Sequence, residues 1–221
     1  MPARIHLALW CILTIAACTI DQRPQQPSSD GSHADTVTRR YPFRSLRLVS
    51  TSSRPDQARP DTSIFMVDDY GRLERSEQIV EIPVRDAPPV RMRTIVIRNG
   101  RTIYNLDVQR RTYRKTVMQV NAGGERFIDF VGLSEAELEA LHVKRRGTAT
   151  VLNRECAVFS VEDPEHDVYG SYLVWMNVPL QMDVAVRGVR MTTRPLELEE
   201  NVTIDTGMFA VPTGYRPMPE P

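Results

Sequence analysis

The sequence has little cysteine, no excess of either charge and no apolar run long enough to cross a membrane as a helix. Its 221 residues include three cysteines, Cys11, Cys18 and Cys156, and 28 basic residues balance 28 acidic ones. A membrane-spanning helix needs about 20 apolar residues, and the apolar stretch from Ile5 to Ala17 is shorter. The balanced charge gives a nucleic-acid partner no electrostatic support.

Motifs that would name a reaction are also missing. We find no glycine-rich phosphate loop, no nucleophile elbow and no paired metal-ligand motif. The acids and the histidine at 162–167 make a weak calcium or zinc site conceivable, but a solvated polar turn fits their spacing better. A catalytic Cys156 would need His33, His142 or His166 as its partner, and its strand-like surroundings favour a small buried side chain instead. We therefore expect no enzyme, no cofactor and no metal.

The first 18 residues resemble a bacterial lipoprotein signal. A weakly basic start precedes the apolar stretch, and Ile15, Ala16 and Ala17 stand directly before Cys18, as in a lipobox. The resemblance implies that residues 1–17 are removed and that Cys18 becomes a lipid-bearing first residue, held in a membrane by several acyl chains. A plain secretory signal whose cleavage site happens to contain a cysteine is the alternative.

The same resemblance sets expectations for location and for the rest of the chain. Thr19, in place of an aspartate, implies export to the outer membrane, facing the periplasm. With Cys11 removed and Cys18 acylated, Cys156 is the only thiol left, so we expect no intramolecular disulfide. Residues 18–40 are expected to form the lipidated N-terminus and a disordered tether, residues 41–215 one domain, and residues 216–221 a disordered tail.

Residues 41–215 have the pattern of consecutive β-strands joined by short turns. Asn99-Gly100 lies between two β-branched runs and predicts a two-residue hairpin turn, in which Arg98 pairs with Arg101. Directly paired residues share a face. The core side of this hairpin is therefore expected to carry Ile95, Ile97, Thr102, Tyr104 and Leu106. Further strands are predicted at 43–50, 63–67, 72–82, 112–120, 149–152, 155–161, 170–176, 180–187, 189–194 and 197–204.

One helix is expected between the two groups of strands. Ser134 and Glu137 form a capping box, and Leu138 and Leu141 lie on one side of a short helix that ends near residues 144–146. Many strands with one amphipathic helix predict an α+β fold that is mainly β. We expect a strongly curved antiparallel sheet, a half-barrel, with the helix packed on its concave side.

A family resemblance rests on the segments 65–75, 97–104, 111–114, 156–159, 172–180 and 208–215. Their order resembles the LolA-like superfamily. Its members include periplasmic lipoprotein carriers, LolB-type outer-membrane receptors, RseB-type envelope sensors and uncharacterised DUF4412-like proteins. This chain departs from the carriers because it has a lipoprotein signal and no counterpart of their helical N-terminal region, so the carrier function does not transfer.

The resemblance implies a hydrophobic concavity that binds a lipid or the acyl chain of a lipoprotein. An apolar stripe at strand spacing is otherwise plain core. The alternative function is an envelope scaffold or sensor that acts through protein–protein contacts at its sheet edges and charged faces. Basic residues are concentrated between Arg85 and Lys115, and solvated sheet faces account for this better than a dedicated site for anionic lipid or a partner. The candidate lining of the concavity is Phe65, Ile95, Ile97, Tyr104, Leu106, Trp175 and Met182.

Overall fold

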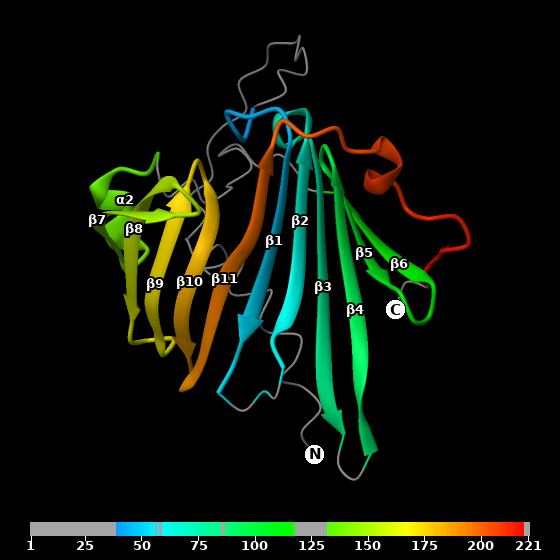
Figure 1. The fold of residues 1–221 in the computed structure, drawn as a ribbon, viewed down its shortest axis with the longest axis horizontal. Helices are drawn as coiled ribbons and strands as arrows, with labels where there is room; N and C mark the ends of the chain where they lie inside the picture. Colours follow the sequence, from blue (N-terminus) through cyan, green and yellow to red (C-terminus); the bar gives the residue numbers. More distant parts are fainter. Residues whose placement is uncertain (1–38, 56, 58, 85–86, 118–131, 219–221) are drawn as a thin grey trace, which may run out of the picture. The chain divides into compact units, whose positions relative to one another are not determined.

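The computed structural model describes residues 39–55, 57, 59–84, 87–117 and 132–218 (Figure 1). The predicted signal peptide, Cys18 and nearly all of the predicted tether lie outside the described residues. The last two residues of the predicted tether are described, and both contact the loop after the second strand. The backbone N–H of Arg40 donates to the Tyr70 carbonyl at 2.9 Å, and the Arg39 guanidinium lies 4.2 Å from the centre of the Tyr70 ring.

The described residues form one twelve-stranded sheet with one α-helix (Figure 1). All neighbouring strands are antiparallel except for the last, β12, which runs parallel to β6. The elements are β1 (Leu46–Ser53), β2 (Asp61–Asp68), β3 (Leu73–Val84), β4 (Ala87–Asn99), β5 (Thr102–Asp107), β6 (Thr112–Val117), α2 (Glu135–Ala140), β7 (Val143–Val151), β8 (Arg154–Asp163), β9 (Val168–Trp175), β10 (Val178–Val186), β11 (Val189–Glu200) and β12 (Arg216–Pro217).

The strand order shows how the chain builds the sheet from its centre. The order across the sheet is β12-β6-β5-β4-β3-β2-β1-β11-β10-β9-β8-β7. The first six strands run outward from β1, the next strands start at the far edge with β7, and β11 returns to pair with β1, where Leu48 lies opposite Leu198. For the described residues, the prediction of a mainly β fold with an antiparallel sheet and one helix is therefore confirmed.

The β4–β5 hairpin has the predicted faces but a different turn. Asn99 pairs with Thr102 and Ile97 with Tyr104, so the turn residues are Gly100 and Arg101, and the predicted pairing of Arg98 with Arg101 is wrong. Gly100 has φ +56°, and glycine at the first turn position is typical of a type II′ turn. The turn shifts by one residue on both strands, which preserves the side of the sheet on which each side chain lies.

The helix α2 begins at the predicted capping box and ends earlier than predicted. The Glu137 N–H donates to Ser134 Oγ at 3.3 Å, and Glu137 Oε2 accepts from the Ser134 N–H at 2.9 Å. The helix stops at Ala140 because β7 begins at Val143 and pairs with β8, so residues 144–146 are strand. Leu138 of the helix is only 1% exposed.

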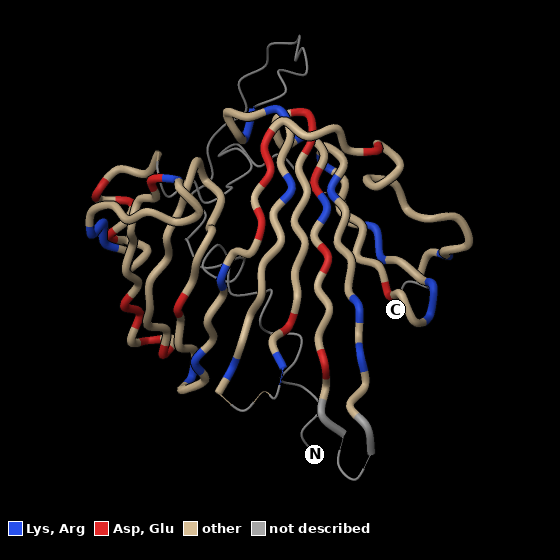
Figure 2. The backbone as a smooth tube through the Cα atoms, in the orientation of Figure 1, with Lys and Arg blue, Asp and Glu red and all other residues tan. Residues whose placement is uncertain are grey.

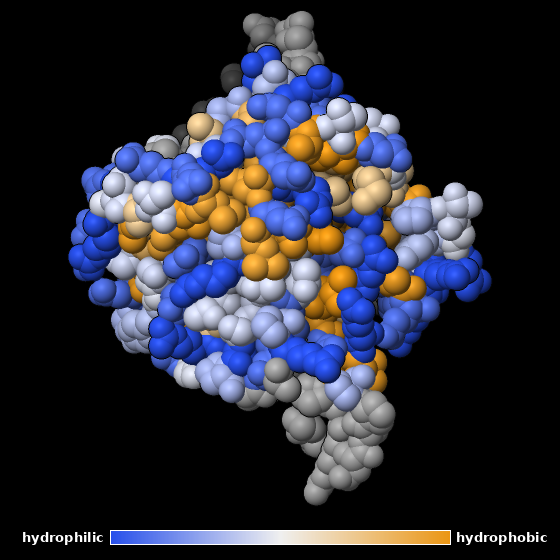
Figure 3. All heavy atoms as spheres, viewed as in Figure 1, coloured by the Kyte–Doolittle hydropathy of each residue, from blue (hydrophilic) through white to orange (hydrophobic). Residues whose placement is uncertain are grey.

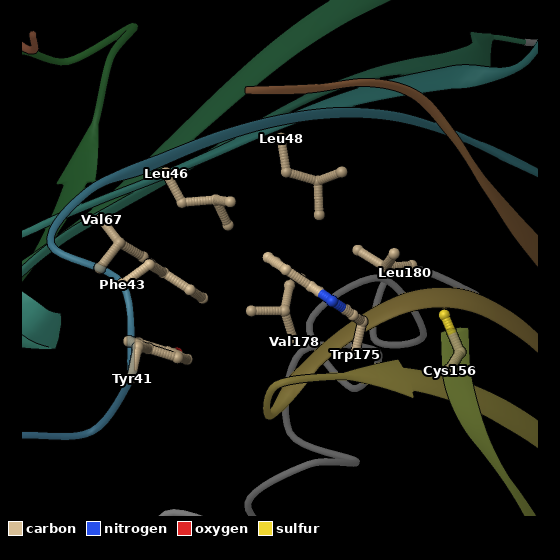
Figure 4. Close-up of a cluster of buried hydrophobic side chains, with 9 residues drawn as sticks. All are labelled: Tyr41, Phe43, Leu46, Leu48, Val67, Cys156, Trp175, Val178 and Leu180. Atoms are coloured by element: carbon tan, nitrogen blue, oxygen red, sulfur yellow. The ribbon is translucent and has the colours of Figure 1, made fainter. Parts of the chain in front are cut away.

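Three apolar clusters lie on the sheet, and we name them by what covers or surrounds them. The central cluster consists of Tyr41, Phe43, Leu46, Leu48, Val67, Cys156, Trp175, Val178 and Leu180, with Phe65 and Leu173 packed against it (Figure 4). The strap cluster consists of Met66, Leu73, Ile95, Ile97, Leu106 and Phe209, with Ile64, Tyr104, Tyr113, Ile204 and Tyr215 packed against it. The helix cluster consists of Leu138, Val143, Phe159, Val161 and Val174, with Tyr172 packed against it.

The central cluster and the strap cluster lie on opposite faces of the sheet, and Trp175 of the central cluster points away from the helix cluster within β9. In β2, Phe65 contacts the central cluster, whereas its neighbour Met66 belongs to the strap cluster. In β9, Trp175 belongs to the central cluster, whereas its neighbour Val174 belongs to the helix cluster. Successive strand residues point to opposite faces. The helix therefore packs on the face of β9 opposite to Trp175. The prediction that the helix lies on the concave side of the sheet is not confirmed.

Residues 201–218, which we call the C-terminal strap, cross the sheet from β11 toward β6. Ser45 Oγ donates to the Val202 carbonyl at 2.7 Å, and the Arg216 N–H donates to the Arg111 carbonyl at 3.0 Å. Arg216 and Pro217 pair with β6 as β12. The first two residues of the segment predicted to be a disordered tail are thus part of the sheet.

Candidate functional site

The structure divides the seven predicted lining residues between the two faces of the sheet. Phe65 and Trp175 lie with the central cluster. Met182 pairs with Tyr172, which packs against the helix cluster. Across β11, Met182 lies in line with Ser52, on the β1 face that carries Leu48. The four hairpin residues, Ile95, Ile97, Tyr104 and Leu106, lie with the strap cluster. No single concavity brings all seven together.

Trp175 is fully engaged by this chain's own side chains. Its ring stacks on Phe43 with 5.6 Å between the ring centroids, and Phe43 in turn stacks on Tyr41 at 5.1 Å (Figure 4). The Arg154 guanidinium lies 4.9 Å from the Trp175 ring centre and also pairs with Glu200. Trp175 is 7% exposed. The central cluster is therefore packed core around this residue.

The C-terminal strap covers the apolar face of the β4–β5 hairpin. Phe209 is 2% exposed and packs with Ile95, Ile97 and Leu106. The Met208 carbonyl, next to it in the chain, accepts from Arg75 Nη1 of β3 at 3.0 Å. An aromatic side chain of the same molecule therefore packs on the hairpin face that is predicted to line the concavity.

Met182 lies beyond an irregularity that the alternating sequence pattern does not reveal. The pairing of β10 with β9 shifts between Pro179 and Gln181, which leaves Leu180 as an extra residue in β10. A bulge of this kind bends the strand and re-aims the side chains beside it. Leu180 accordingly joins the central cluster, while Met182 lies opposite Tyr172 on one side and Thr193 on the other.

A cleft of about 420 Å³ lies on the β3–β4 part of the sheet and is lined by Glu77, Ile79, Arg91 and Arg93. The strand register places these residues on the face that carries the strap cluster, because Glu77 pairs with Ile95 and Ile79 with Arg93. The cleft therefore continues the face on which Ile95 and Ile97 lie, at the point where the covered apolar surface ends.

A buried network of charges fixes one wall of the cleft. Glu77 is 6% exposed, and its carboxylate receives Arg93 Nε at 2.6 Å and Arg93 Nη2 at 2.8 Å, a two-pronged contact. Arg75, which is 5% exposed, adds Nη2 at 3.4 Å. The hydrogen bond with Glu77 raises the pKa of Arg93 above its usual range, so this guanidinium stays charged.

Arg91 supplies the second positive charge of the cleft, and it is exposed. Its cross-strand neighbour on β3 is Glu81, whose carboxylate lies 3.8 Å from Arg59. With Glu77 occupied by two guanidinium groups, the cleft combines an aliphatic wall at Ile79 with net positive charge. Such a lining is chemically complementary to a carboxylate or phosphate that stands next to an apolar chain.

The residues considered for chemistry in the sequence behave as structural residues. Cys156 is fully buried, and burial raises the pKa of its thiol. In the loop after β8, Asp163 accepts from the backbone N–H groups of Glu165 and His166 and contacts His166 Nδ1 at 2.7 Å, which makes a closed polar turn. Within the described ranges, no three His, Cys, Asp or Glu side chains are placed to hold a metal ion.

Sequence reasoning missed the cleft because it followed the core side of the first hairpin strand back only to Ile95. The strand begins at Ala87, and Arg91, Arg93, Ile95 and Ile97 alternate along one face of it. Extending the period-2 pattern backward from the hairpin would have placed both arginines beside the apolar strip.

Comparisons with known proteins give similarities of fold only. The sequence matches no family model and no curated protein. A crystal structure of an uncharacterised conserved protein from Thermus thermophilus is 8% identical, with a TM-score of 0.49 over 80% of this chain and 91% of that one. MucB is 13% identical, with a TM-score of 0.44 over 79% of this chain and 59% of the MucB chain, and it has also been crystallised with MucA(peri). LprF from Mycobacterium bovis is 10% identical, with a TM-score of 0.33 over 76% and 90% of the two chains.

These similarities all have TM-scores below 0.5 and carry no argument about function. This chain spans about three fifths of the MucB chain. In the part of the chain that is described, no helix combines the length and the apolar character needed to cross a bilayer.

Proposed function

We propose that this chain is a lipid-anchored, non-enzymatic binding protein of the bacterial envelope that holds an anionic amphiphile, such as a long-chain fatty acid, in the β3–β4 cleft. One observation carries the proposal: Arg91 and Arg93 stand beside Ile79 on the face that continues the apolar strip of β4. The acid head would meet the guanidinium groups, and the acyl chain would lie along Ile79. This places the proposed ligand in a charged cleft and not in the predicted hydrophobic concavity.

The charge of the cleft decides which ligands fit. A neutral hydrocarbon gains only from contact with Ile79, whereas an anion also gains a charge-assisted hydrogen bond that is worth roughly 1.5–3 kcal/mol. Arg93 cannot be the main contributor, because Glu77 already takes two of its donors. Arg91 is therefore the residue on which discrimination depends.

Titration of the full-length protein with palmitate and with palmityl alcohol, which has the same chain without the charge, tests this assignment. We expect palmitate to bind more tightly than the alcohol, and Arg91→Gln to weaken palmitate about tenfold while leaving the alcohol unchanged. Arg187→Gln is the control, because it removes the same charge from the turn between β10 and β11, far from the cleft in the sequence. It should change the affinity for neither probe. Equal binding of both probes to the native protein contradicts the proposal.

The anchor is tested separately from the cleft. Cys18→Ser should move the protein from the membrane fraction to the soluble fraction of cells, because several acyl chains on one residue give a stable anchor and none remain after the change. Cell fractionation followed by mass spectrometry of the N-terminal peptide measures both location and lipid. A protein that stays in the membrane fraction without lipid would contradict the anchoring step.

A scaffold or sensor that works through protein contacts is the second candidate. Figure 3 shows apolar side chains gathered over β8–β11 on one face. Leu196 of β11, at the place where the pairing with β1 shifts, is 56% exposed. Site-specific photo-crosslinking in cells from position 196 would capture one defined protein if the surface around Leu196 docks a partner. The matched position is Leu152, which is 42% exposed in the β7–β8 turn. Equal, diffuse crosslinking from both positions counts against this function.

A further inference from the structure

Positive charge is concentrated at the β4–β6 end of the sheet. Between Ala87 and Val117 the chain has eight basic residues and one acidic residue, Asp107. Figure 2 shows the same concentration of blue segments along β4, β5 and β6. Residues 132–168, which form the other end of the sheet with α2, have four basic and eight acidic residues. The two ends of the sheet therefore differ strongly in charge although the whole sequence is neutral.

The basic side chains around the β5–β6 turn and on β6 are available for an external partner. Arg111, Arg114 and Lys115 are exposed, and none of them has an ion-pair partner within the described ranges. Arg110 is 79% exposed and lies 3.6 Å from Asp107, a distance at which an exposed pair contributes little. Because neighbouring residues of β6 point to opposite faces, Arg114 and Lys115 extend the charge around the edge of the sheet.

Exposed apolar side chains accompany this charge. Val117 at the end of β6 is 56% exposed, and Met218, whose N–H donates to the Tyr113 carbonyl of β6, is 37% exposed. The combination of arginine, lysine and isolated apolar groups suits the headgroup region of a membrane, where charged groups meet lipid phosphates and apolar groups enter the acyl boundary.

We propose that this basic edge, formed by the β5–β6 turn, β6 and Met218, docks on anionic lipid headgroups of the membrane that carries the anchor. The occupant is a phosphate-bearing lipid surface. The proposal goes beyond ligand binding in the cleft, and it uses the proposed anchor only to hold the domain close to the surface. The acidic end, with α2 and the β8–β9 loop, faces away because the same surface repels it.

Docking at this edge also places the cleft near the membrane. Asp107, at the start of the β5–β6 turn, pairs with Thr94 of β4. Thr94 directly follows Arg93, so the turn lies beside the Arg93 wall of the cleft. An amphiphile in the lipid surface would then have a short path to the guanidinium groups.

The orientation is measured by energy transfer from a dye on the lipidated full-length protein to acceptor-labelled lipid headgroups. One protein carries the dye at Gln109→Cys in the β5–β6 turn, and the matched protein carries it at Glu165→Cys in the loop after β8. Vesicles consist of phosphatidylcholine alone or mixed with phosphatidylglycerol. We expect phosphatidylglycerol to increase transfer from position 109 and to decrease it from position 165, and high salt to abolish both changes.

Charge reversal identifies the residues that dock. The triple change Arg111→Glu, Arg114→Glu and Lys115→Glu should remove the response to phosphatidylglycerol, since each basic group near such a surface is worth about a fivefold change in affinity. Reversal of Lys144, Arg145 and Arg146 on β7 changes charge by the same amount at the other edge and should leave the response intact. If the protein carries no lipid, energy transfer from the same dyes is measured while vesicles are added to the protein in solution. A missing anchor is thereby distinguished from a basic edge that does not bind the membrane.

Two results overturn the proposal. One is equal transfer from position 109 on both kinds of vesicle. The other is a protein partner in place of lipid. In that case phosphatidylglycerol has no effect, and an acidic envelope protein copurifies with the native protein but not with the triple charge-reversal variant.

Discussion

At the residue scale, Phe209 determines whether the apolar hairpin face is open or closed. Its ring packs against Ile95, Ile97 and Leu106 and is 2% exposed, whereas its neighbour Met208 is 36% exposed. Truncating a buried phenylalanine removes transfer free energy and leaves a cavity, so Phe209→Ala should lower the free energy of unfolding by about 3–5 kcal/mol. Met208→Ala is the matched change and should cost under about 1 kcal/mol. Urea denaturation measures both, and equal effects would mean that the strap does not close this face.

At the same scale, the pH dependence of stability tests the environment of Glu74. It is half-buried beside Arg40, whose Nη1 lies 2.7 Å from Glu74 Oε1, and burial raises its pKa in spite of that partner. A carboxyl with a raised folded-state pKa stabilises the protein below its unfolded pKa, about 4.3, and this contribution is lost as the pH rises through the folded-state value. The stability of Glu74→Gln relative to the native protein should therefore increase between acid and neutral pH. A relative stability that decreases over this range would show that the ion pair with Arg40 dominates.

Single residues were predictable from sequence where their chemistry is local. The capping box of Ser134 and Glu137 needs only four residues and formed as expected. The partners of Trp175 were not predictable, because Phe43 and Arg154 reach it through strand pairings far apart in the sequence.

At the element scale, Gly170 is required where β9 passes between β8 and β10. A Cβ atom at this position would lie 2.3 Å from the Asp183 carbonyl oxygen and 2.6 Å from the Val184 Cα, and backbone atoms cannot move aside like a flexible side chain. Gly170→Ala should destabilise the protein by about 1–3 kcal/mol or prevent expression of folded protein. Gly207→Ala is the control, because its nearest neighbour is the Asp205 carboxylate at 3.3 Å. Thermal unfolding that is unchanged by Gly170→Ala would contradict the close packing of these strands.

Elements differ in how well sequence patterns predict them. The β4–β5 hairpin kept its predicted faces although its turn moved by one residue, because the alternation of Ile95 and Ile97 determines the buried side independently of the turn. The bulge at Leu180 was not predictable from the regular alternation of β10, since it depends on how β9 pairs with that strand. The early end of α2 reflects the same cause: pairing of β7 with β8 outweighs the helical pattern after Ala140.

At the scale of the whole molecule, the sheet order explains why the predicted lipid site is divided. The two halves of the chain meet at β1 and β11, and the apolar face of the β4–β5 hairpin is turned away from the central cluster. A sequence pattern reports which side chains share a face within one hairpin, but it does not report which faces of distant strands coincide. The strap then fills the hairpin face, which leaves the charged cleft of β3 and β4 as the proposed binding place.

The central claim is that an anionic amphiphile binds in this cleft, and photo-crosslinking locates the ligand directly. Full-length protein is irradiated with a long-chain fatty acid that carries a photoreactive group near its carboxylate, and the modified peptides are sequenced by mass spectrometry. We expect modification of β3 and β4 near Ile79 and Arg91, which palmitate competes and which Arg91→Gln abolishes. Modification concentrated at Trp175 and Leu180 of the central cluster, or no saturable modification, would contradict the claim.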